Sequence, residues 1–229
     1  MIERHKSINI NETVYHNSLE IEGDGSIFKD ALFFDLEHYI YRKPICVGVF
    51  GCCYFDEKEN MLKVTQYMIE NRKDVKSILI LAKNYFKLMS DKYGKKYIIT
   101  FSGNNDFTVI NYLFQKYKIG YNIEEYFKHI DLQKQYEKEK NEPIGLKSLE
   151  KQFDILRDSE LISGSNLAKT FSKIIKDEQY IHRMPVDKKE KILLYNEQDV
   201  VSLFHIYVNW GNVVNNALLE DNKVLENEN

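Results

Sequence analysis

The sequence predicts an α/β fold in which helices flank a mixed β-sheet. Three short apolar runs, at residues 31–37, 45–54 and 62–69, follow one another closely and predict a meander of neighbouring strands. A strand–helix alternation comes next, and only helical patterns follow residue 132. This order of elements indicates helices layered on a sheet that has an antiparallel three-stranded start and later parallel strands.

Each later element is predicted by its own pattern. Between residues 74 and 93 apolar side chains recur at helical spacing, and Gly94 marks the end of this helix. Residues 1–27 carry no clear pattern. The remaining predicted elements are a strand at 96–101, a helix at 106–117, a strand that ends at 130–132, and helices at 133–140, 145–155, 164–177 and 186–214.

The length of 229 residues suits one domain with additions at its ends. We expect an N-terminal extension at 1–27, one α/β domain at 28–215 and a polar C-terminal tail at 216–229. Hydrophobic residues make up 43% and charged residues 29%, which is typical of a soluble globular protein. The formal net charge of −3 gives no global sign of nucleic-acid binding, so any basic surface must be local.

The expected location is the cytoplasm. The first residues are charged, no apolar run follows them as in a signal peptide, and no stretch reaches the roughly 20 apolar residues of a membrane span. Cys46, Cys52 and Cys53 share one apolar segment without a nearby His–Cys cluster. They are expected to be buried thiols in a reducing compartment.

Two acids end the first predicted strand. Side chains alternate across a strand, so Asp35 and Glu37 share one face while Leu36 points to the other. Two buried carboxylates need a neutralising cation, and Mg²⁺ and Mn²⁺ prefer carboxylate oxygens. The alternative is a pair of solvated acids where the chain leaves the sheet.

Two further acids lie later in the chain. Asp106 starts the helix after the 96–101 strand, where it is either a metal ligand or a cap of the helix. Tyr195 and Asp199 lie four residues apart and share one face of the last helix. Their alternative is a core tyrosine followed by an exposed acid.

In this order the acids resemble those of the DEDD superfamily of 3′–5′ exonucleases, which is DnaQ-like and has a ribonuclease H fold. The tyrosine-bearing branch is the better fit, because the position where the other branch has histidine is Leu194. The chain is most similar to the YprB-type ribonuclease H-like family over roughly residues 30–210. The similar segments are Phe34-Asp35-Leu36-Glu37, Pro44-Ile45-Cys46-Val47-Gly48-Val49, Ser102-Gly103-Asn104-Asn105-Asp106-Phe107, His129-Ile130-Asp131-Leu132, Gly145-Leu146-Lys147-Ser148-Leu149-Glu150, Ile162-Ser163-Gly164 and Tyr195-Asn196-Glu197-Gln198-Asp199-Val200. The chain departs from the family at His38-Tyr39-Ile40, where a Thr-rich sequence is usual.

The resemblance implies two Mg²⁺ or Mn²⁺ ions about 4 Å apart, with Asp35 bridging them. Glu37 and Asp199 would complete one ion, and Asp106 would hold the other. Tyr195 would orient or deprotonate the attacking water, whose pKa the metal lowers. These residues would together hydrolyse phosphodiester bonds from a single-stranded 3′ end of DNA or RNA.

Other residues are candidates for supporting roles. Asn105, Lys147 and Arg157 are candidates for contacting the substrate. Asp131 either supports the site or caps the helix at 133–140. A catalytically silent nucleic-acid-binding module and an endonuclease of the same fold remain alternatives, and retention of four like charges favours an enzyme. The chain has no Gly-rich phosphate loop and no recognisable Ser–His pair, so nothing favours a small-molecule enzyme.

Overall fold

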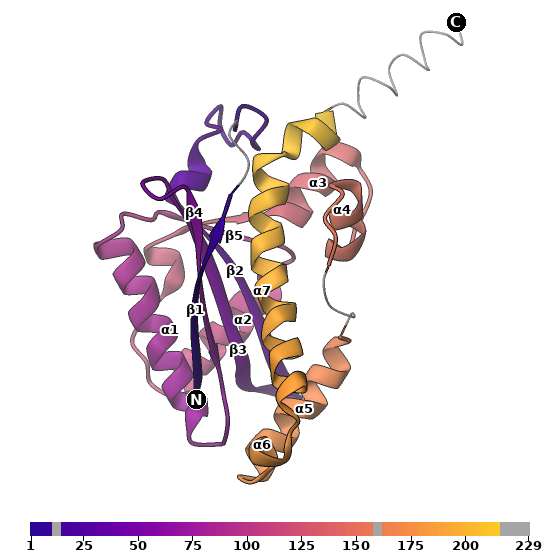
Figure 1. Cartoon of the computed structure of the whole chain (residues 1–229). Helices are drawn as coiled ribbons and strands as arrows, with labels where there is room; N and C mark the ends of the chain where they lie inside the picture. The colour runs from indigo at the N-terminus through magenta and orange to yellow at the C-terminus, as the bar shows by residue number, and fades with distance from the viewer. Residues whose placement is uncertain (11–14, 158–161, 216–229) are drawn as a thin grey trace, which may run out of the picture.

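The computed structural model describes residues 1–10, 15–157 and 162–215. They form an α/β fold in which helices cover both faces of one mixed sheet (Figure 1). The strands lie in the order β1-β4-β3-β2-β5-β6 across the sheet. The first four strands in this order are antiparallel to their neighbours, whereas β5 pairs parallel with β2 and β6 pairs parallel with β5. The strands are β1 (Ile2–Asn9), β2 (Ala31–Tyr41), β3 (Lys43–Asp56), β4 (Met61–Met68), β5 (Tyr97–Thr100) and β6 (Lys128–Asp131). The predicted fold class is therefore confirmed.

The helices follow the predicted order with changed ends, and the short α6 was not predicted. They are α1 (Asp74–Asp91), α2 (Asn104–Lys116), α3 (Leu132–Lys140), α4 (Leu146–Gln152), α5 (Gly164–Lys176), α6 (Tyr180–Arg183) and α7 (Val186–Val208). Short 3₁₀ turns at Ile27–Asp30 and Ile123–Glu125 and a π-helical turn at Gly211–Asn215 complete the described elements.

Three details differ from the sequence analysis. The segment without an assignment contains β1, which pairs along its whole length with β4. The helix after β5 begins at Asn104 rather than Asp106, and α7 ends at Val208 rather than near residue 214. The expected polar tail at 216–229 lies outside the described residues.

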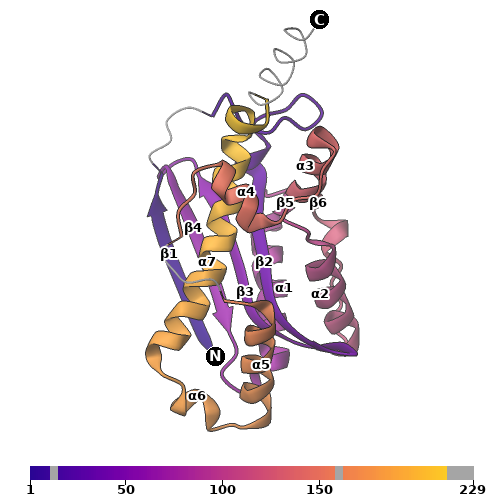
Figure 2. The same ribbon diagram turned by 90° about the vertical axis from the view of Figure 1, so that its right-hand side faces the viewer.

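The two faces of the sheet carry different helices. Figures 1 and 2 show α1 and α2 on one side and the long α7 crossing the other. Side chains of β2 alternate between these layers: Phe34 lies 5.5 Å from the ring of Phe86 in α1, and Phe33 lies 5.5 Å from the ring of Phe204 in α7. Asp35 and Glu37 continue the row of Phe33, so both acids face α7.

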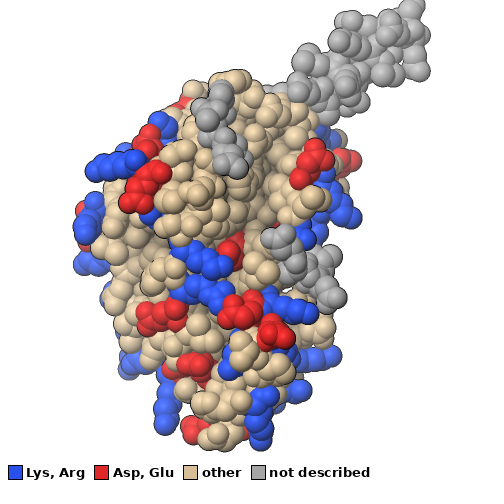
Figure 3. Space-filling view, viewed as in Figure 1, with Lys and Arg blue, Asp and Glu red and all other residues tan. Residues whose placement is uncertain are grey.

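Ion pairs attach the edge strand β1 to α7. Arg4 lies 2.6 Å from Glu190, and Lys6 lies 2.6 Å from Glu197. On the face over β1 and α7, basic and acidic side chains are correspondingly intermingled (Figure 3). In the described part of the chain, no helix is long and apolar enough to cross a membrane. All three cysteines are buried free thiols, as predicted.

Candidate metal centre

Three of the predicted acids meet between β2 and α7. Asp35, Glu37 and Asp199 each offer a carboxylate oxygen, and these oxygens all lie within 4.8 Å of one another. Only 9% of Glu37 and 4% of Asp199 is exposed. The alternatives of solvated acids at a strand end and of an exposed acid on the last helix are therefore wrong.

The cluster concentrates like charge in a buried place. Burial, with the nearby charge of Asp199, raises the pKa of Asp35 to about 7. Burial and the charges of Asp35 and Asp199 hold the pKa of Glu37 well above its usual range. A divalent cation would remove this repulsion, and three converging carboxylate oxygens are the donors that Mg²⁺ and Mn²⁺ prefer. The residues present therefore fit such a metal.

Asp106 lies beside this cluster but not within it. It is the third residue of α2 and is 7% exposed, and its carboxylate accepts no hydrogen bond from a described residue. It does not cap the helix, because Gly103 occupies the N-cap position without a side-chain bond. Burial, followed by the charges of Asp35 and Asp199, holds its pKa well above the usual range. Asp106 thus offers a carboxylate close to the cluster that no side chain of the described residues occupies with a hydrogen bond or an ion pair.

The position of Asp106 depends on Asp131 at the end of β6. One Asp131 oxygen accepts from the backbone N–H of Ser102 at 2.9 Å and of Gln133 at 3.1 Å. The other accepts from the N–H of Gly103 at 3.2 Å. Asp131 therefore caps α3 and also fixes the loop that leads into α2. The capping role considered in the sequence analysis is confirmed.

Asn196 is a functional candidate that the sequence analysis missed. It is fully buried, and its side-chain Nδ2 donates to Asp35 Oδ2 at 2.9 Å. Its Oδ1 accepts from Gln66 Nε2 at 2.8 Å, and the same Nε2 also lies 2.8 Å from the carbonyl oxygen of Leu193. These bonds join Asp35 to β4 through α7.

Gly51 makes room for this arrangement. It pairs with Asp35 on one side and with Gln66 on the other. A Cβ at position 51 would come within 2.0 Å of Asn196 Oδ1, so a larger residue would collide with the amide. An isolated glycine in a buried strand often marks such a close approach, and this signal could have indicated the site.

Two cations reach the cluster from the segment between α3 and α5. Lys147 in α4 and Arg157 both form ion pairs with Asp199 Oδ1. Arg157 also donates from Nε to Glu150 at 2.7 Å, and Glu150 is buried. Both candidates for phosphate contacts therefore lie at the acidic cluster. Asn105 is exposed in the first turn of α2, and no contact of its side chain supports or excludes a substrate role.

Tyr195 lies one turn before Asp199, and the cations of Lys147 and Arg157 both lie over its ring. Lys147 Nζ is 4.7 Å and Arg157 Cζ is 5.3 Å from the ring centre. Burial and the charges of Asp199 and Glu37 raise the pKa of the phenol above its usual range. The hydroxyl therefore keeps its proton near pH 7 in the metal-free protein.

Comparison with known proteins gives one match. The family model described as the RNase_H superfamily matches residues 32–211, which is well over half of the chain. No curated protein and no solved structure gives a significant match. The six-stranded mixed sheet flanked by helices agrees with the matched family. The chain belongs to the RNase_H superfamily, and this membership suggests a nucleic-acid hydrolase.

Proposed function

We propose that the protein is a two-metal-ion 3′–5′ exonuclease of the tyrosine-bearing DEDD branch, of the YprB type. The observation that carries the proposal is the convergence of Asp35 and Glu37 of β2 with Asp199 of α7 within 4.8 Å, where Glu37 and Asp199 are buried. Lys147 and Arg157 neutralise Asp199, but no ion pair among the described residues reaches Asp35 or Glu37, and a fold gains no stability from gathering these two like charges. A bound cation explains the cluster better than a structural role.

The four acids divide between two ions. Asp35, Glu37 and Asp199 would hold one, and Asp106 with Asp35 would hold the other. The bound cations would supply Lewis acidity and charge neutralisation at the scissile phosphate. Asn196 fixes the orientation of Asp35 through its 2.9 Å hydrogen bond, so this carboxylate is already oriented in the metal-free protein.

Tyr195 orients the attacking water in this proposal. Its raised pKa makes proton abstraction by the phenol unfavourable, so a positioning hydrogen bond is the role that its chemistry supports. Lys147 and Arg157, which pair with Asp199, are the cations of the site that would contact the substrate phosphate. The Tyr-x-x-x-Asp spacing on α7 favours an exonuclease over an endonuclease of the same fold.

The test is a cleavage time course on 5′-labelled single-stranded DNA and RNA with Mg²⁺, Mn²⁺ or EDTA. We expect a ladder that shortens from the 3′ end, is slowed by a blocked 3′ terminus and is abolished by EDTA and by Asp35→Ala. Efficient cutting of a closed circular strand would instead establish an endonuclease. Tight binding without cleavage under every metal condition would establish a silent binding module.

A further inference from the structure

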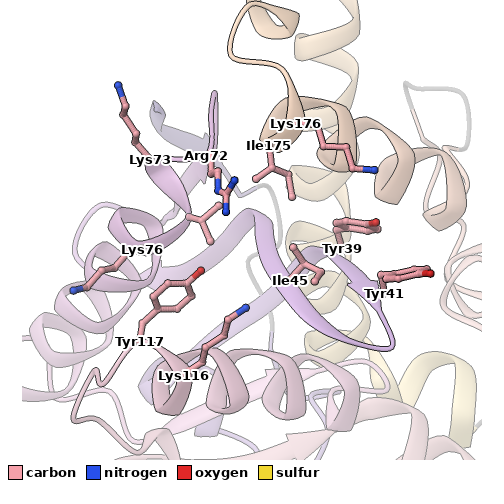
Figure 4. Close-up of a pocket in the computed structure, with 11 residues that line it drawn as sticks. Tyr39, Tyr41, Ile45, Arg72, Lys73, Lys76, Lys116, Tyr117, Ile175 and Lys176 are labelled. Carbon is pink, nitrogen blue, oxygen red and sulfur yellow. The ribbon is translucent and has the colours of Figure 1, made fainter.

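A basic and aromatic pocket lies at the end of the β2–β3 hairpin. It has a volume of about 950 Å³ and is bounded by the hairpin, the start of α1 and the C-terminal ends of α2 and α5 (Figure 4). Its polar lining consists of five cations and three tyrosines, without an acidic side chain: Arg72, Lys73, Lys76, Lys116, Lys176, Tyr39, Tyr41 and Tyr117. We name this set the hairpin pocket.

The cations of the hairpin pocket are available to a ligand. All five are exposed, and none forms an ion pair with a residue in the described ranges. Asp74, the acid in the first turn of α1, is instead engaged with the N-terminal amine of Met1 at 3.2 Å and the N–H of Glu70 at 2.8 Å. The pocket is therefore a strongly positive surface in a chain whose net charge is −3.

Helix stability does not explain this placement. Lys116 and Lys176 lie in the last turns of α2 and α5, where the helix dipole favours a cation. Arg72, Lys73 and Lys76 instead surround the N-terminus of α1, where the dipole disfavours a cation. Cations held at this unfavourable end indicate a ligand that carries negative charge.

The tyrosines indicate what else the ligand carries. Tyr41 is 64% exposed, far more than a core ring, and Tyr39 and Tyr117, which also line the pocket, are partly exposed. Figure 4 shows the rings of Tyr39 and Tyr41 next to each other beside Lys176, with Tyr117 between Lys76 and Lys116. Flat aromatic rings among cations are the means by which proteins bind single-stranded nucleic acid without reading its sequence.

The hairpin pocket and the acidic cluster share one strand. Glu37 and Tyr41 are four residues apart on β2, so their Cα atoms are separated by no more than about 14 Å. That distance corresponds to a few nucleotides of an extended strand. We propose that the hairpin pocket binds single-stranded DNA or RNA a few nucleotides from the scissile end, with phosphates on its cations and bases on its tyrosines.

This inference rests on the proposed function for its substrate class, but binding without metal tests it separately. The probes are fluorescent oligo(dT) and oligo(U) of about 15 nucleotides, a length that covers one site of this kind, measured by anisotropy in EDTA. The pocket variant is Lys76→Glu with Lys116→Glu. The matched control is Lys58→Glu with Lys128→Glu, two exposed lysines at the opposite end of the sheet.

We expect the pocket variant to bind the oligonucleotides at least about tenfold more weakly than the wild type. The slope of log K against log salt should become shallower by about 1.4, which corresponds to two lost phosphate contacts. The control variant should bind like the wild type. Tyr41→Ala should weaken binding on the order of tenfold, while Tyr41→Phe, which keeps the ring, should not. Thermal melts should change little, because the substituted side chains are exposed and the helix-dipole effects of Lys76→Glu at the start of α1 and Lys116→Glu at the end of α2 oppose each other.

Three results would overturn the inference. The first is that the wild type binds neither oligonucleotide, and the second is that the pocket and control variants lose the same binding affinity. The third is that poly-glutamate binds as tightly as the oligonucleotides and Tyr41→Ala has no effect. The last result would mean a surface for acidic proteins. If binding depends on the pocket but the protein never cleaves, the binding role of the hairpin pocket is supported and the proposed exonuclease activity is refuted. If the protein cleaves but the pocket variant binds like the wild type, the exonuclease activity is supported and the binding role of the hairpin pocket is refuted.

Discussion

Asn196 on α7 donates a 2.9 Å hydrogen bond to Asp35 on β2, across 161 residues of sequence. Asp35 is the acid proposed to be shared by both metals, and Asn196 lies on α7 between the proposed site residues Tyr195 and Asp199. The bond therefore couples the orientation of Asp35 to the position of α7, the helix that carries the proposed ligand Asp199.

Asn196→Ala should reduce both stability and turnover. It removes the donor to Asp35 and one partner of the buried Gln66 amide, and unsatisfied buried groups cost about 1–3 kcal/mol each. The melting temperature should fall by several degrees, and single-turnover cleavage should slow because the carboxylate is no longer oriented. Calorimetry and rapid-quench kinetics measure these effects. If the melting temperature and the cleavage rate of Asn196→Ala both equal those of the wild type, the hydrogen bond neither stabilises the fold nor orients Asp35.

Gly51→Ala should displace α7 from the sheet. The new methyl group would lie within 2.0 Å of Asn196 Oδ1, and neither strand nor helix can move without breaking other buried contacts. Overpacking of this kind typically costs about 1–3 kcal/mol. The effect is measured by denaturant unfolding, with Gly120→Ala as the control because a Cβ there meets nothing within 4 Å. Equal stability of the two variants would contradict the close approach.

Asp35→Asn should stabilise the metal-free protein at neutral pH. The pKa of Asp35 is about 7 in the folded protein against 3.8 for an ordinary Asp, so the folded state holds its proton more tightly. The stability from this group is fully present below 3.8 and is lost as the pH rises through about 7. The variant should thus melt on the order of 5 °C higher near pH 8 in EDTA, with little difference near pH 4.

The same substitution should remove the stabilisation by Mn²⁺. Binding only to the folded state raises the melting temperature of the wild type, and this gain requires the ionised carboxylate. A full Mn²⁺ shift in Asp35→Asn would rule out Asp35 as a metal ligand. A pH-independent difference between the two proteins in EDTA would rule out the protonation of Asp35.

Tyr195→Phe should separate water positioning from metal binding. It removes the hydroxyl and keeps a ring for Lys147 and Arg157, so the Mn²⁺ thermal shift should survive. Single-turnover cleavage should slow by roughly 10²–10⁴-fold. Asp199→Asn should instead weaken both metal binding and turnover. Unimpaired cleavage by Tyr195→Phe would leave the residue as a half-buried core ring.

Lys147→Met should raise the affinity for Mn²⁺ and lower the affinity for nucleic acid. Lys147 is paired with Asp199 in the metal-free protein, so a metal must compete with it for the carboxylate. Loss of one phosphate contact should also reduce the salt slope of oligonucleotide binding by about 0.7. Lys151→Met is the control, since Lys151 lies one turn away on α4 and is exposed. Calorimetric titration with Mn²⁺ measures the first effect; an unchanged affinity would show that Lys147 does not compete.

The sequence by itself determined the candidate acids and the order and type of the elements from β2 onward, apart from the short α6. Alternation placed Asp35 and Glu37 on one face of β2, and helical spacing placed Tyr195 and Asp199 on one face of α7. These are local periodicities of the backbone, and a single chain displays them without any knowledge of its partners. The edge strand β1 has no such signal, because its alternate side chains are mostly exposed and polar.

Only the tertiary structure decided which polar groups meet. Asp106 could be a cap or a ligand until the packing of α2 buried it beside Asp35 without a donor. Asn196, Gln66 and Gly51 are far apart in sequence and meet because α7 crosses the strands at one register. The hairpin pocket likewise gathers its five cations from three separate segments. Sequence periodicity fixes where a side chain points relative to its own element, whereas the distance to a partner depends on how the elements pack.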